Sequence, residues 1–234
     1  MVVGNGMIAK EFENYREDDS VIIFASGVSD STSNDSNAFE REKKLIIETQ
    51  NAYKEKLFVY FSTCSIDDHS MEGSAYKDHK IKMENLIMDN DTPFIIFRLT
   101  NPIGKTNNTH TVVNYFINNI REKHEFIVWK NATRNLIDID DLYLICNEIL
   151  QQGLFKNSIV NIANPENYPV SFIVSSIEKH FGINGNYILL DKGGGPLINT
   201  EAIEPLFKKF NISFDEHYLD RLLQKYFPEN SSIL

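Results

Sequence analysis

Val2-Val3-Gly4-Asn5-Gly6-Met7-Ile8-Ala9 joins a short apolar strand to the start of a helix through two glycines. This Gly-x-Gly-x-x-Ala spacing, directly after a strand and at the opening of a helix, is the context that a dinucleotide-binding turn requires. Gly4 permits the tight turn, Gly6 lets the backbone approach a pyrophosphate, and Ala9 keeps helix and strand close. The free N–H groups at the helix start favour phosphate. A plain strand-to-helix turn is the alternative interpretation.

Apolar, β-branched runs alternate with longer amphipathic stretches along the rest of the chain, which is typical of βαβ units around a buried parallel sheet. The expected strands cover residues 2–3, 21–24, 57–61, 94–98, 126–129, 159–162 and 187–190. The expected helices cover residues 7–15, 39–53, 75–88, 111–123, 140–152, 171–181, 201–209 and 216–226. The fold class is therefore α/β, with a sheet-forming domain at residues 1–163 and a small α+β portion at residues 164–234.

Composition and charge exclude several classes of protein. The chain has 234 residues, 42% of them hydrophobic, and can bury a substantial core. Its net charge of 23 − 33 = −10 and its pI near 5.1 argue against general nucleic-acid binding, which needs a basic surface. No apolar run reaches the ~18 residues of a membrane span, no signal peptide is visible, and two cysteines do not make a disulfide framework. We therefore expect a cytoplasmic protein without membrane or nucleic-acid partners.

A tyrosine and a lysine one helical turn apart, Tyr76 and Lys80, form the candidate catalytic pair. Lys80 shares an apolar helix face with Met83 and Ile87, where a solvated lysine would not be placed. A phenol with a pKa of about 10 is a poor acid–base catalyst at neutral pH unless a nearby cation stabilises its phenolate. The alternative is an ordinary amphipathic helix with a buried tyrosine.

Small and hydroxyl side chains stand at two strand ends. The strand at residues 57–61 runs into Ser62 and Thr63, and the strand at residues 21–24 runs into Ala25-Ser26-Gly27. Open α/β sheets bind ligands at the carboxyl ends of their strands. A hydroxyl there can orient a carbonyl or carbinol oxygen. An acid that would hold a ribose is expected ~20 residues after the glycine turn, and the strand end at that distance does not supply one.

The order of these motifs resembles that of the extended short-chain dehydrogenase/reductase family. The motifs are the glycine turn, the VIIFASG segment at residues 21–27, the strand ending in Ser62-Thr63 and the pair Tyr76-x-x-x-Lys80. Within that family the sequence is most similar to nucleotide-sugar epimerases, dehydratases and 4-ketoreductases. Residues 98–104 resemble the family segment that touches nicotinamide and sugar. Residues 134–142 resemble a later segment whose arginine grips the nucleotide diphosphate.

The resemblance implies an abbreviated Rossmann-like parallel sheet with helices on both faces and a small C-terminal substrate-binding portion. It implies Thr63 as the hydroxyl partner, Tyr76 as the proton donor and acceptor, and Lys80 as the cation. The implied cofactor is NAD or NADP, held by Gly4, Gly6, Met7, Ile8, Ala25, Ser26, Gly27, Ser62, Tyr76, Lys80, Pro102 and Ile103. The implied substrate-binding residues are Thr63, Asn101, Lys105 and Arg134, although a solvated loop is an equal alternative for the segment at Lys105. No metal is expected, because the histidines show no ligand spacing.

Two departures from the family pattern matter. The strand at residues 21–24 resembles one that normally comes two strands later, so the chain looks like a family member without its second and third strands. That deletion explains the absent ribose acid. Cys64 and Ser65 follow Thr63 where sugar 4,6-dehydratases carry Asp and Glu, so a 4,6-dehydratase is disfavoured.

We therefore expect an NAD(P)-dependent enzyme that reduces a 4-keto group of a nucleotide-activated sugar or epimerises a carbinol, in the synthesis of surface-polysaccharide precursors. Both reactions use the same three residues, so the sequence does not choose between them. A non-catalytic sensor of sugar nucleotides or dinucleotides is the alternative, motivated by the shortened adenosine pocket. We also expect a homodimer through the helices at residues 39–53 and 75–88, which carry more apolar side chains than one sheet-facing stripe needs.

The missing strands predict weak discrimination between NAD(H) and NADP(H). Selectivity usually rests on a basic or an acidic residue at the ribose 2′ position, and no strand aims Lys10, Arg16 or the acids at residues 17–19 toward it. Dissociation constants for NADH and NADPH, measured by calorimetric titration, should lie within about tenfold, or ~1.4 kcal/mol. A preference of about a hundredfold would contradict this and assign the missing ribose contact to the loop at residues 29–37.

Overall fold

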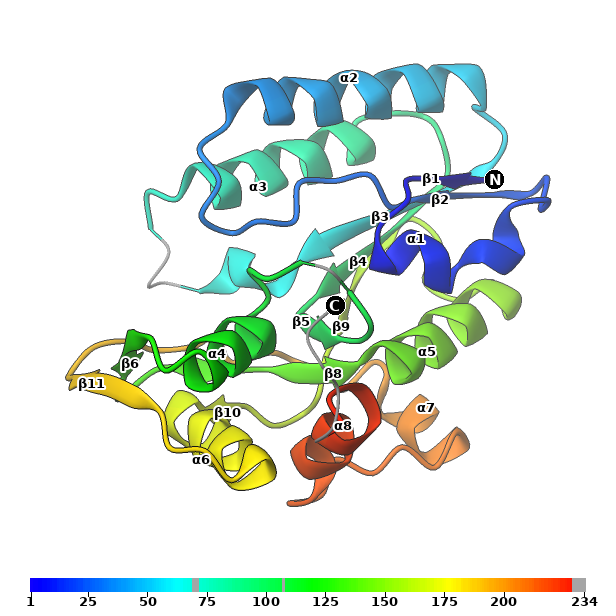
Figure 1. Ribbon diagram of the computed structural model, residues 1–234. Coiled ribbons are helices and arrows are strands. Elements are labelled where there is room, and N and C mark those ends of the chain that lie inside the picture. The colour runs from blue at the N-terminus through cyan, green and yellow to red at the C-terminus, as the bar shows by residue number, and fades with distance from the viewer. Residues whose placement is uncertain (69–71, 107, 229–234) are drawn as a thin grey trace.

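A five-stranded parallel sheet forms the centre of the molecule in the computed structural model, which describes residues 1–68, 72–106 and 108–228 (Figure 1). The strands lie in the order β1, β2, β3, β4 and β9, and each is parallel to its neighbours. The predicted α/β class is confirmed. The strands are β1 (Val2–Val3), β2 (Val21–Phe24), β3 (Leu57–Thr63), β4 (Phe94–Leu99) and β9 (Ser158–Ile162).

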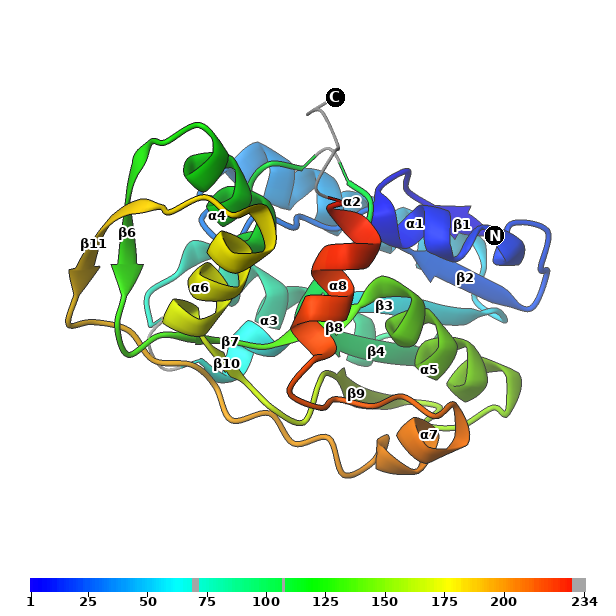
Figure 2. The same cartoon turned by 60° about the horizontal axis from the view of Figure 1, so that its bottom comes forward.

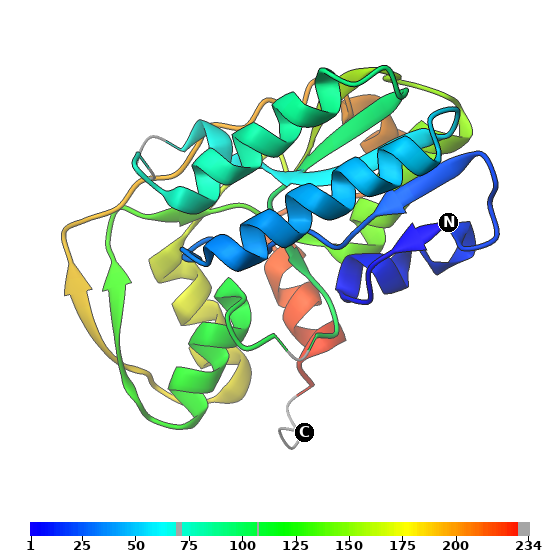
Figure 3. The same cartoon turned by 90° about the horizontal axis from the view of Figure 1, so that it is seen from above.

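Helices cover both faces of this sheet because successive strand residues point to opposite sides (Figures 1 and 3). In β2, Ile22 and Phe24 pack with α2 and α3, whereas Ile23 belongs to the apolar cluster on the other face, with α1, α5 and α7. The five helices are α1 (Met7–Glu11), α2 (Ser36–Ala52), α3 (Ala75–Met88), α5 (Ile139–Gln151) and α7 (Glu204–Lys209).

A second region has an apolar cluster of its own, in which Phe116, Val128, Val174 and Leu219 are buried together (Figure 2). The cluster takes side chains from both sides of residue 163, and the domain division at that residue stays a prediction. Its helices are α4 (Val112–Arg121), α6 (Val170–Phe181) and α8 (Tyr218–Tyr226).

The strand expected at residues 126–129 belongs to this second region and does not join the five-stranded sheet. It forms β6 (Glu125–Trp129), which pairs in parallel with β11 (Asn186–Leu190) as a separate two-stranded sheet. Phe126 and Val128 point into the second cluster, while Ile127 and Trp129 are exposed on the other side. Four short strands that the sequence pattern missed make two more pairs. They are β5 (Asn101–Ile103) with β8 (Leu136–Asp138), and β7 (Thr133–Arg134) with β10 (Tyr168–Pro169).

Several helix boundaries differ from the sequence expectation, among them the start of α7 at Glu204 and of α8 at Tyr218, and two of the differences have an identifiable cause. The helix expected at residues 7–15 ends at Glu11 and continues as a 3-10 turn, which places Phe12 and Tyr15 in the core three residues apart. Helix α2 begins three residues earlier than expected, at Ser36, because the Asp35 carboxylate caps it by accepting from the N–H groups of Asn37 and Ala38.

Strand β1 is an edge of the sheet, and among the described residues no further strand lies beyond it. It is two residues long and pairs only with β2, with Val2 opposite Ile23 and Val3 opposite Phe24. The side of the glycine turn where a longer sheet would continue therefore has no strand to support a ligand.

Gly4 should be indispensable to this edge. Its φ of +128° is unfavourable for other residues, and a Cβ there would overlap the carbonyl oxygen of Ala25, whose N–H donates to Val3 at 2.8 Å. Gly4→Ala should lower the free energy of unfolding by about 1–3 kcal/mol or more, measured by urea denaturation. Gly6→Ala is the matched control: a Cβ at Gly6 meets open space, so its stability should change by less than about 1 kcal/mol. Equal losses in both variants would show that the turn tolerates a side chain.

Candidate active site

The carboxyl ends of β1, β2, β3 and β4 bring the predicted site residues to one edge of the sheet, where ligands of open α/β sheets bind. The turn at Gly4 and Gly6 follows β1, and the turn at residues 25–27 follows β2. Ser62 and Thr63 end β3, and Asn101 comes two residues after β4. These segments are far apart in the sequence and adjacent in the fold.

The glycine turn offers the features that a pyrophosphate needs. Gly6 is the N-cap of α1, no side chain caps that helix, and the position of a Gly6 Cβ is open. Met7 and Ile8 begin the helix and pack against the core beneath the turn. At the end of β3, the Ser62 hydroxyl is buried and has no hydrogen-bond partner within the described chain. An uncapped turn and an unsatisfied hydroxyl at one sheet edge fit a dinucleotide.

The turn after β2, Ala25-Ser26-Gly27, is held from two sides. The Arg41 guanidinium donates to the Ser26 carbonyl at 3.1 Å and to its hydroxyl at 3.3 Å. A Cβ at Gly27 would lie 2.8 Å from both the Glu42 Oε1 and the Lys80 Nζ. A side chain at position 27 would therefore force the Glu42–Lys80 pair to move.

Tyr76 and Thr63 lie together at the end of β3, and both are buried. The Thr63 hydroxyl hydrogen-bonds the Tyr76 phenol and also accepts the N–H of Ser65 at 3.1 Å. Burial raises the pKa of Tyr76 to about 12; the Thr63 hydrogen bond opposes this, and the negative charges of Glu42 and Asp30 add to it. The phenol is thus fully protonated at neutral pH in this structure.

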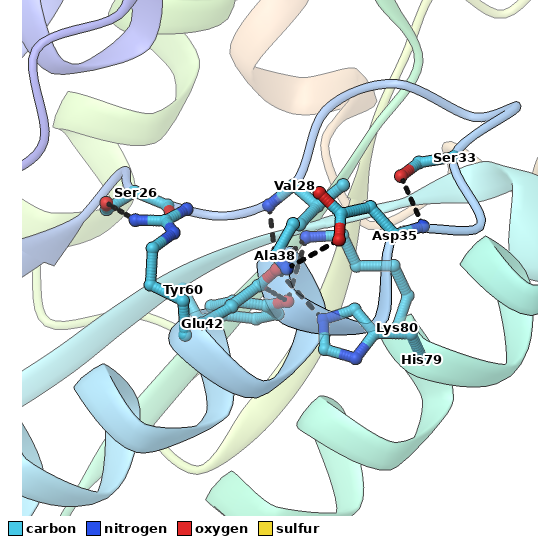
Figure 4. Close-up of polar contacts among 10 residues, drawn as sticks. Ser26, Val28, Ser33, Asp35, Ala38, Glu42, Tyr60, His79 and Lys80 are labelled. Atoms are coloured by element: carbon cyan, nitrogen blue, oxygen red, sulfur yellow. Dashed lines mark hydrogen bonds and ion pairs between the residues drawn. The ribbon is translucent and has the colours of Figure 1, made fainter.

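Lys80 is buried as its apolar helix face implies, but its charge is directed at a partner that the sequence analysis did not consider (Figure 4). Its Nζ lies 3.0 Å from the Glu42 carboxylate and 3.0 Å from the Tyr60 hydroxyl. The same nitrogen is 5.9 Å from the centre of the Tyr76 ring. Burial lowers the pKa of Lys80, and the Glu42 charge opposes that shift.

Glu42 accepts hydrogen bonds on both carboxylate oxygens, as Figure 4 shows. Oε1 accepts from Tyr60 at 2.6 Å and from Lys80 at 3.0 Å, while Oε2 accepts the Val28 N–H at 2.7 Å and contacts the His79 Nε2 at 2.9 Å. Burial alone would raise the pKa of Glu42, but these partners outweigh it and lower that pKa to about 2. A fully buried carboxylate is thereby kept ionised.

The residues predicted to bind substrate after β4 do not all lie together in the structure. Asn101 donates from its side-chain amide to the Asn135 carbonyl at 2.8 Å, and it lines a small cavity together with Pro102 and Ile103. Lys105 is exposed and is not among the residues that line this cavity. Arg134 is half-buried on β7 and donates to the carbonyl of its neighbour Thr133 at 2.7 Å. The structure therefore brings Asn101, Pro102 and Ile103 together and leaves Lys105 apart.

Cys64 is unsuited to a chemical role. Its thiol is buried against the Arg98 carbonyl, 3.2 Å away, and burial raises its pKa to about 12. The described residues contain no group of three or more His, Cys, Asp or Glu placed to hold a metal ion. None of the described helices is both long and apolar enough to cross a membrane.

Glu42 is the residue that the sequence analysis missed. A signal for it existed: Glu42, Ile46 and Thr49 recur at the spacing of one helix face, and all three are buried in α2. A single carboxylate on an apolar stripe indicates a buried charge that needs a partner. The identity of that partner depends on the packing of α2 against α3, which one sequence does not show.

The sequence from residue 7 to residue 163 matches the NAD dependent epimerase/dehydratase family. The match covers more than half of the chain, and the chain belongs to this family. The resemblance seen in the sequence is thus confirmed at the level of the family. A comparison with curated proteins found no match.

Solved structures share the fold at low sequence identity. PbgP3 from Burkholderia pseudomallei is 18% identical, with 97% of this chain and 80% of that chain covered and a TM-score of 0.69. UDP-glucuronic acid 4-epimerase from Bacillus cereus, in complex with NAD, is 16% identical, with 88% and 74% covered and a TM-score of 0.66. RMD from Pseudomonas aeruginosa, complexed with NADPH, is 12% identical, with 83% and 89% covered and a TM-score of 0.63. At these identities the similarity shows the fold.

Glu42 should stabilise the fold at neutral pH and lose this effect in acid. Because folding lowers its pKa from 4.5 to about 2, its contribution is complete above the unfolded value and disappears as the pH falls through the folded value. Glu42→Gln should lower the free energy of unfolding by about 3–5 kcal/mol near neutral pH, because it leaves Lys80 buried without its counter-charge.

Urea denaturation from neutral pH down to about pH 2 measures the free energy of unfolding of the unaltered protein and of Glu42→Gln. The difference between these two free energies should narrow from pH 4.5 down to about 2. Glu48→Gln is the control on the same helix. Its exposed side chain pairs with exposed Lys44, so it should change stability by less than about 1 kcal/mol at any pH. A destabilisation by Glu42→Gln that is constant over the whole range would contradict the assignment.

Proposed function

We propose that the chain is an NAD(P)-dependent enzyme that acts on a nucleotide-activated sugar, either reducing a 4-keto group or epimerising a carbinol, in the synthesis of surface-polysaccharide precursors. The observation that carries this proposal is the contact between the Thr63 and Tyr76 hydroxyls at the carboxyl edge of the sheet, beside an uncapped glycine turn. Family membership and the NAD or NADPH bound by relatives support it.

When bound, the dinucleotide supplies a nicotinamide ring that accepts or donates a hydride. In this proposal Gly4, Gly6 and the start of α1 hold the pyrophosphate, and Ser62 supplies a hydroxyl that has no partner within the described chain. Either dinucleotide is compatible with this proposal, because among the described residues no strand lies beyond β1 to place a charged side chain at the ribose. The choice between NAD and NADP stays open.

In this proposal, residues of the chain transfer the proton and bind the sugar nucleotide. Tyr76 exchanges a proton with the sugar oxygen, and Thr63 orients that oxygen beside the phenol. Lys80 is the cation of the site, with its Nζ 5.9 Å from the centre of the Tyr76 ring and 3.0 Å from the Glu42 carboxylate. Asn101 and Arg134 contact the sugar nucleotide, an assignment supported by the sugar-nucleotide name of the Bacillus cereus relative.

A non-catalytic sensor of sugar nucleotides or dinucleotides is the second candidate. The observation in its favour is that Glu42 neutralises Lys80, so the cation is not free to stabilise a Tyr76 phenolate. Calorimetric titration with NAD(H), NADP(H) and UDP-, GDP- and dTDP-sugars separates the candidates. Binding of sugar nucleotides without any dinucleotide at millimolar concentration would favour the sensor.

Tyr76→Phe should abolish most turnover and leave the fold intact. The loss of the proton donor should lower kcat by about 10²- to 10⁴-fold. The missing hydrogen bond to Thr63 should cost only about 0.5–1.5 kcal/mol of stability. Tyr53→Phe, which alters an exposed phenol at the end of α2, is the matched control and should leave both quantities unchanged. Full turnover by the Tyr76→Phe protein would overturn the catalytic assignment.

We also propose that the chain is a cytoplasmic homodimer that uses α2 and α3. Of the apolar residues on these helices, Ile46 and Met83 are buried against the sheet, which leaves the exposed Ile47 and Met88 for a partner. Light scattering at tens of micromolar should give a particle of twice the 27.0 kDa of one chain. Met88→Glu should shift it toward a single chain, because a buried unpaired charge opposes association. A single-chain mass for the unaltered protein would refute the dimer.

A further inference from the structure

The end of β2 lies between the glycine turn and the Thr63–Tyr76 pair. The three strands are neighbours in the order β1, β2 and β3, with the glycine turn after β1 and Thr63 at the end of β3. A Cβ at Gly4 would overlap the Ala25 carbonyl, so the turns after β1 and β2 pack directly on each other. Neighbouring strands are ~4.8 Å apart, which puts about 10 Å between the glycine turn and Thr63. A dinucleotide with its pyrophosphate at that turn and its nicotinamide beside Tyr76 would therefore pass over residues 25–27.

A pyrophosphate is strongly anionic, and the turn itself supplies little charge to balance it. Helix α1 is five residues long, so few peptide dipoles are aligned at its start. Lys80 is directed at Glu42, with 3.0 Å between its Nζ and the carboxylate, and both side chains are buried. The chain as a whole carries a net charge of −10. A balancing cation at this edge has to come from another residue.

Arg41 places a guanidinium at the end of β2. Helix α2 connects the parallel strands β2 and β3, so its first turns lie at the carboxyl edge of the sheet. From there Arg41 donates through Nη2 to the Ser26 carbonyl at 3.1 Å and through Nη1 to the Ser26 hydroxyl at 3.3 Å. The side chain is exposed and forms no ion pair within the described part of the chain. Since a guanidinium has five N–H donors, its contacts with Ser26 leave further donors for a ligand.

We propose that Arg41 binds the pyrophosphate of the dinucleotide and supplies the positive charge that Lys80 directs at Glu42 instead. This inference rests on the proposed function and adds a binding residue to it. A guanidinium suits a phosphate group because its planar N–H donors can reach two oxygens at once. Ser26 is the acceptor that holds this guanidinium beside the glycine turn.

The position of Arg41 favours the pyrophosphate over the second phosphate site of NADP(H), the 2′-phosphate on the adenosine ribose. In the proposed arrangement the nicotinamide lies at β3 and the pyrophosphate at the turn after β1, so the adenosine lies beyond β1, where no described strand follows. Ser26 is on the opposite side of that turn, at the end of β2. Arg41 therefore acts on the charge that NAD(H) and NADP(H) share and does not select between them.

Calorimetric titration of NADH, NADPH and ADP-ribose into Arg41→Gln tests this assignment. The variant removes the charge and keeps an amide that can donate to the Ser26 carbonyl. Its dissociation constants for the three ligands should rise by about tenfold or more and by the same factor, because each ligand loses a hydrogen bond between charged groups at the pyrophosphate. Arg41→Lys keeps the charge without the planar donors, so its dissociation constants should lie between those of the unaltered protein and Arg41→Gln.

Lys44→Gln is the matched control on the same helix. Lys44 is exposed, pairs with Glu48 and lies farther along α2 from the sheet edge, so its replacement should leave the three dissociation constants unchanged. Salt supplies a second readout. Raising the ionic strength should weaken NADH binding to the unaltered protein more than binding to Arg41→Gln, because an exposed charge contact is screened. An equal salt dependence in both proteins would show that Arg41 only holds the turn, and would overturn the inference.

The pattern across the three ligands separates this inference from the proposed function. If the unaltered protein binds NADH and Arg41→Gln binds it equally well, the inference is overturned and the proposed function stays in place. A loss confined to NADPH would assign Arg41 to the 2′-phosphate, and a loss that spares ADP-ribose would assign it to the nicotinamide half; either result overturns the inference alone. An unaltered protein that binds none of the three ligands would remove the proposed function and the inference together.

Discussion

The buried carboxylate of Glu42 is the interaction on which the arrangement around the site depends. It joins α2 to Tyr60 of β3, to His79 and Lys80 of α3 and, through the Val28 N–H, to the loop that follows β2. Removing an ion from water costs several kcal/mol, so a carboxylate here is tolerable only if all of its acceptor positions are used. Four partners meet that requirement and at the same time fix the distance between the two helices.

Gly27 links this cluster to the turn that a dinucleotide would contact. A Cβ at Gly27 would lie 2.8 Å from the ends of the Glu42 and Lys80 side chains. The backbone of this loop is held by the Val28 N–H on Glu42 and by Arg41 on Ser26. The position of the turn after β2 is thus determined by electrostatics inside the protein as well as by the pairing of β2 with its neighbours.

Much of the fold could be predicted from the sequence, because it rests on local patterns. β-branched runs indicated the strands of the sheet, and amphipathic spacing placed α3 at residues 75–88 as observed. The separate pairing of β6 with β11 could not be predicted, since the two strands lie some sixty residues apart and only packing brings Phe126 beside Tyr187. The spacing that predicted the Tyr76 and Lys80 pair likewise carried no information on Glu42, which approaches from a different helix.

The edge position of β1 changes which contacts can hold a ligand. Among the described residues no strand lies beyond β1, so an adenosine bound at this edge would lie against less protein surface, and less apolar area would be removed from water there. In the proposed function, more of the binding free energy would then come from the pyrophosphate turn and from the groups around Thr63 and Tyr76. A buried carboxylate that holds the loop after β2 through the Val28 N–H would therefore be of greater consequence in this short sheet than in a longer one.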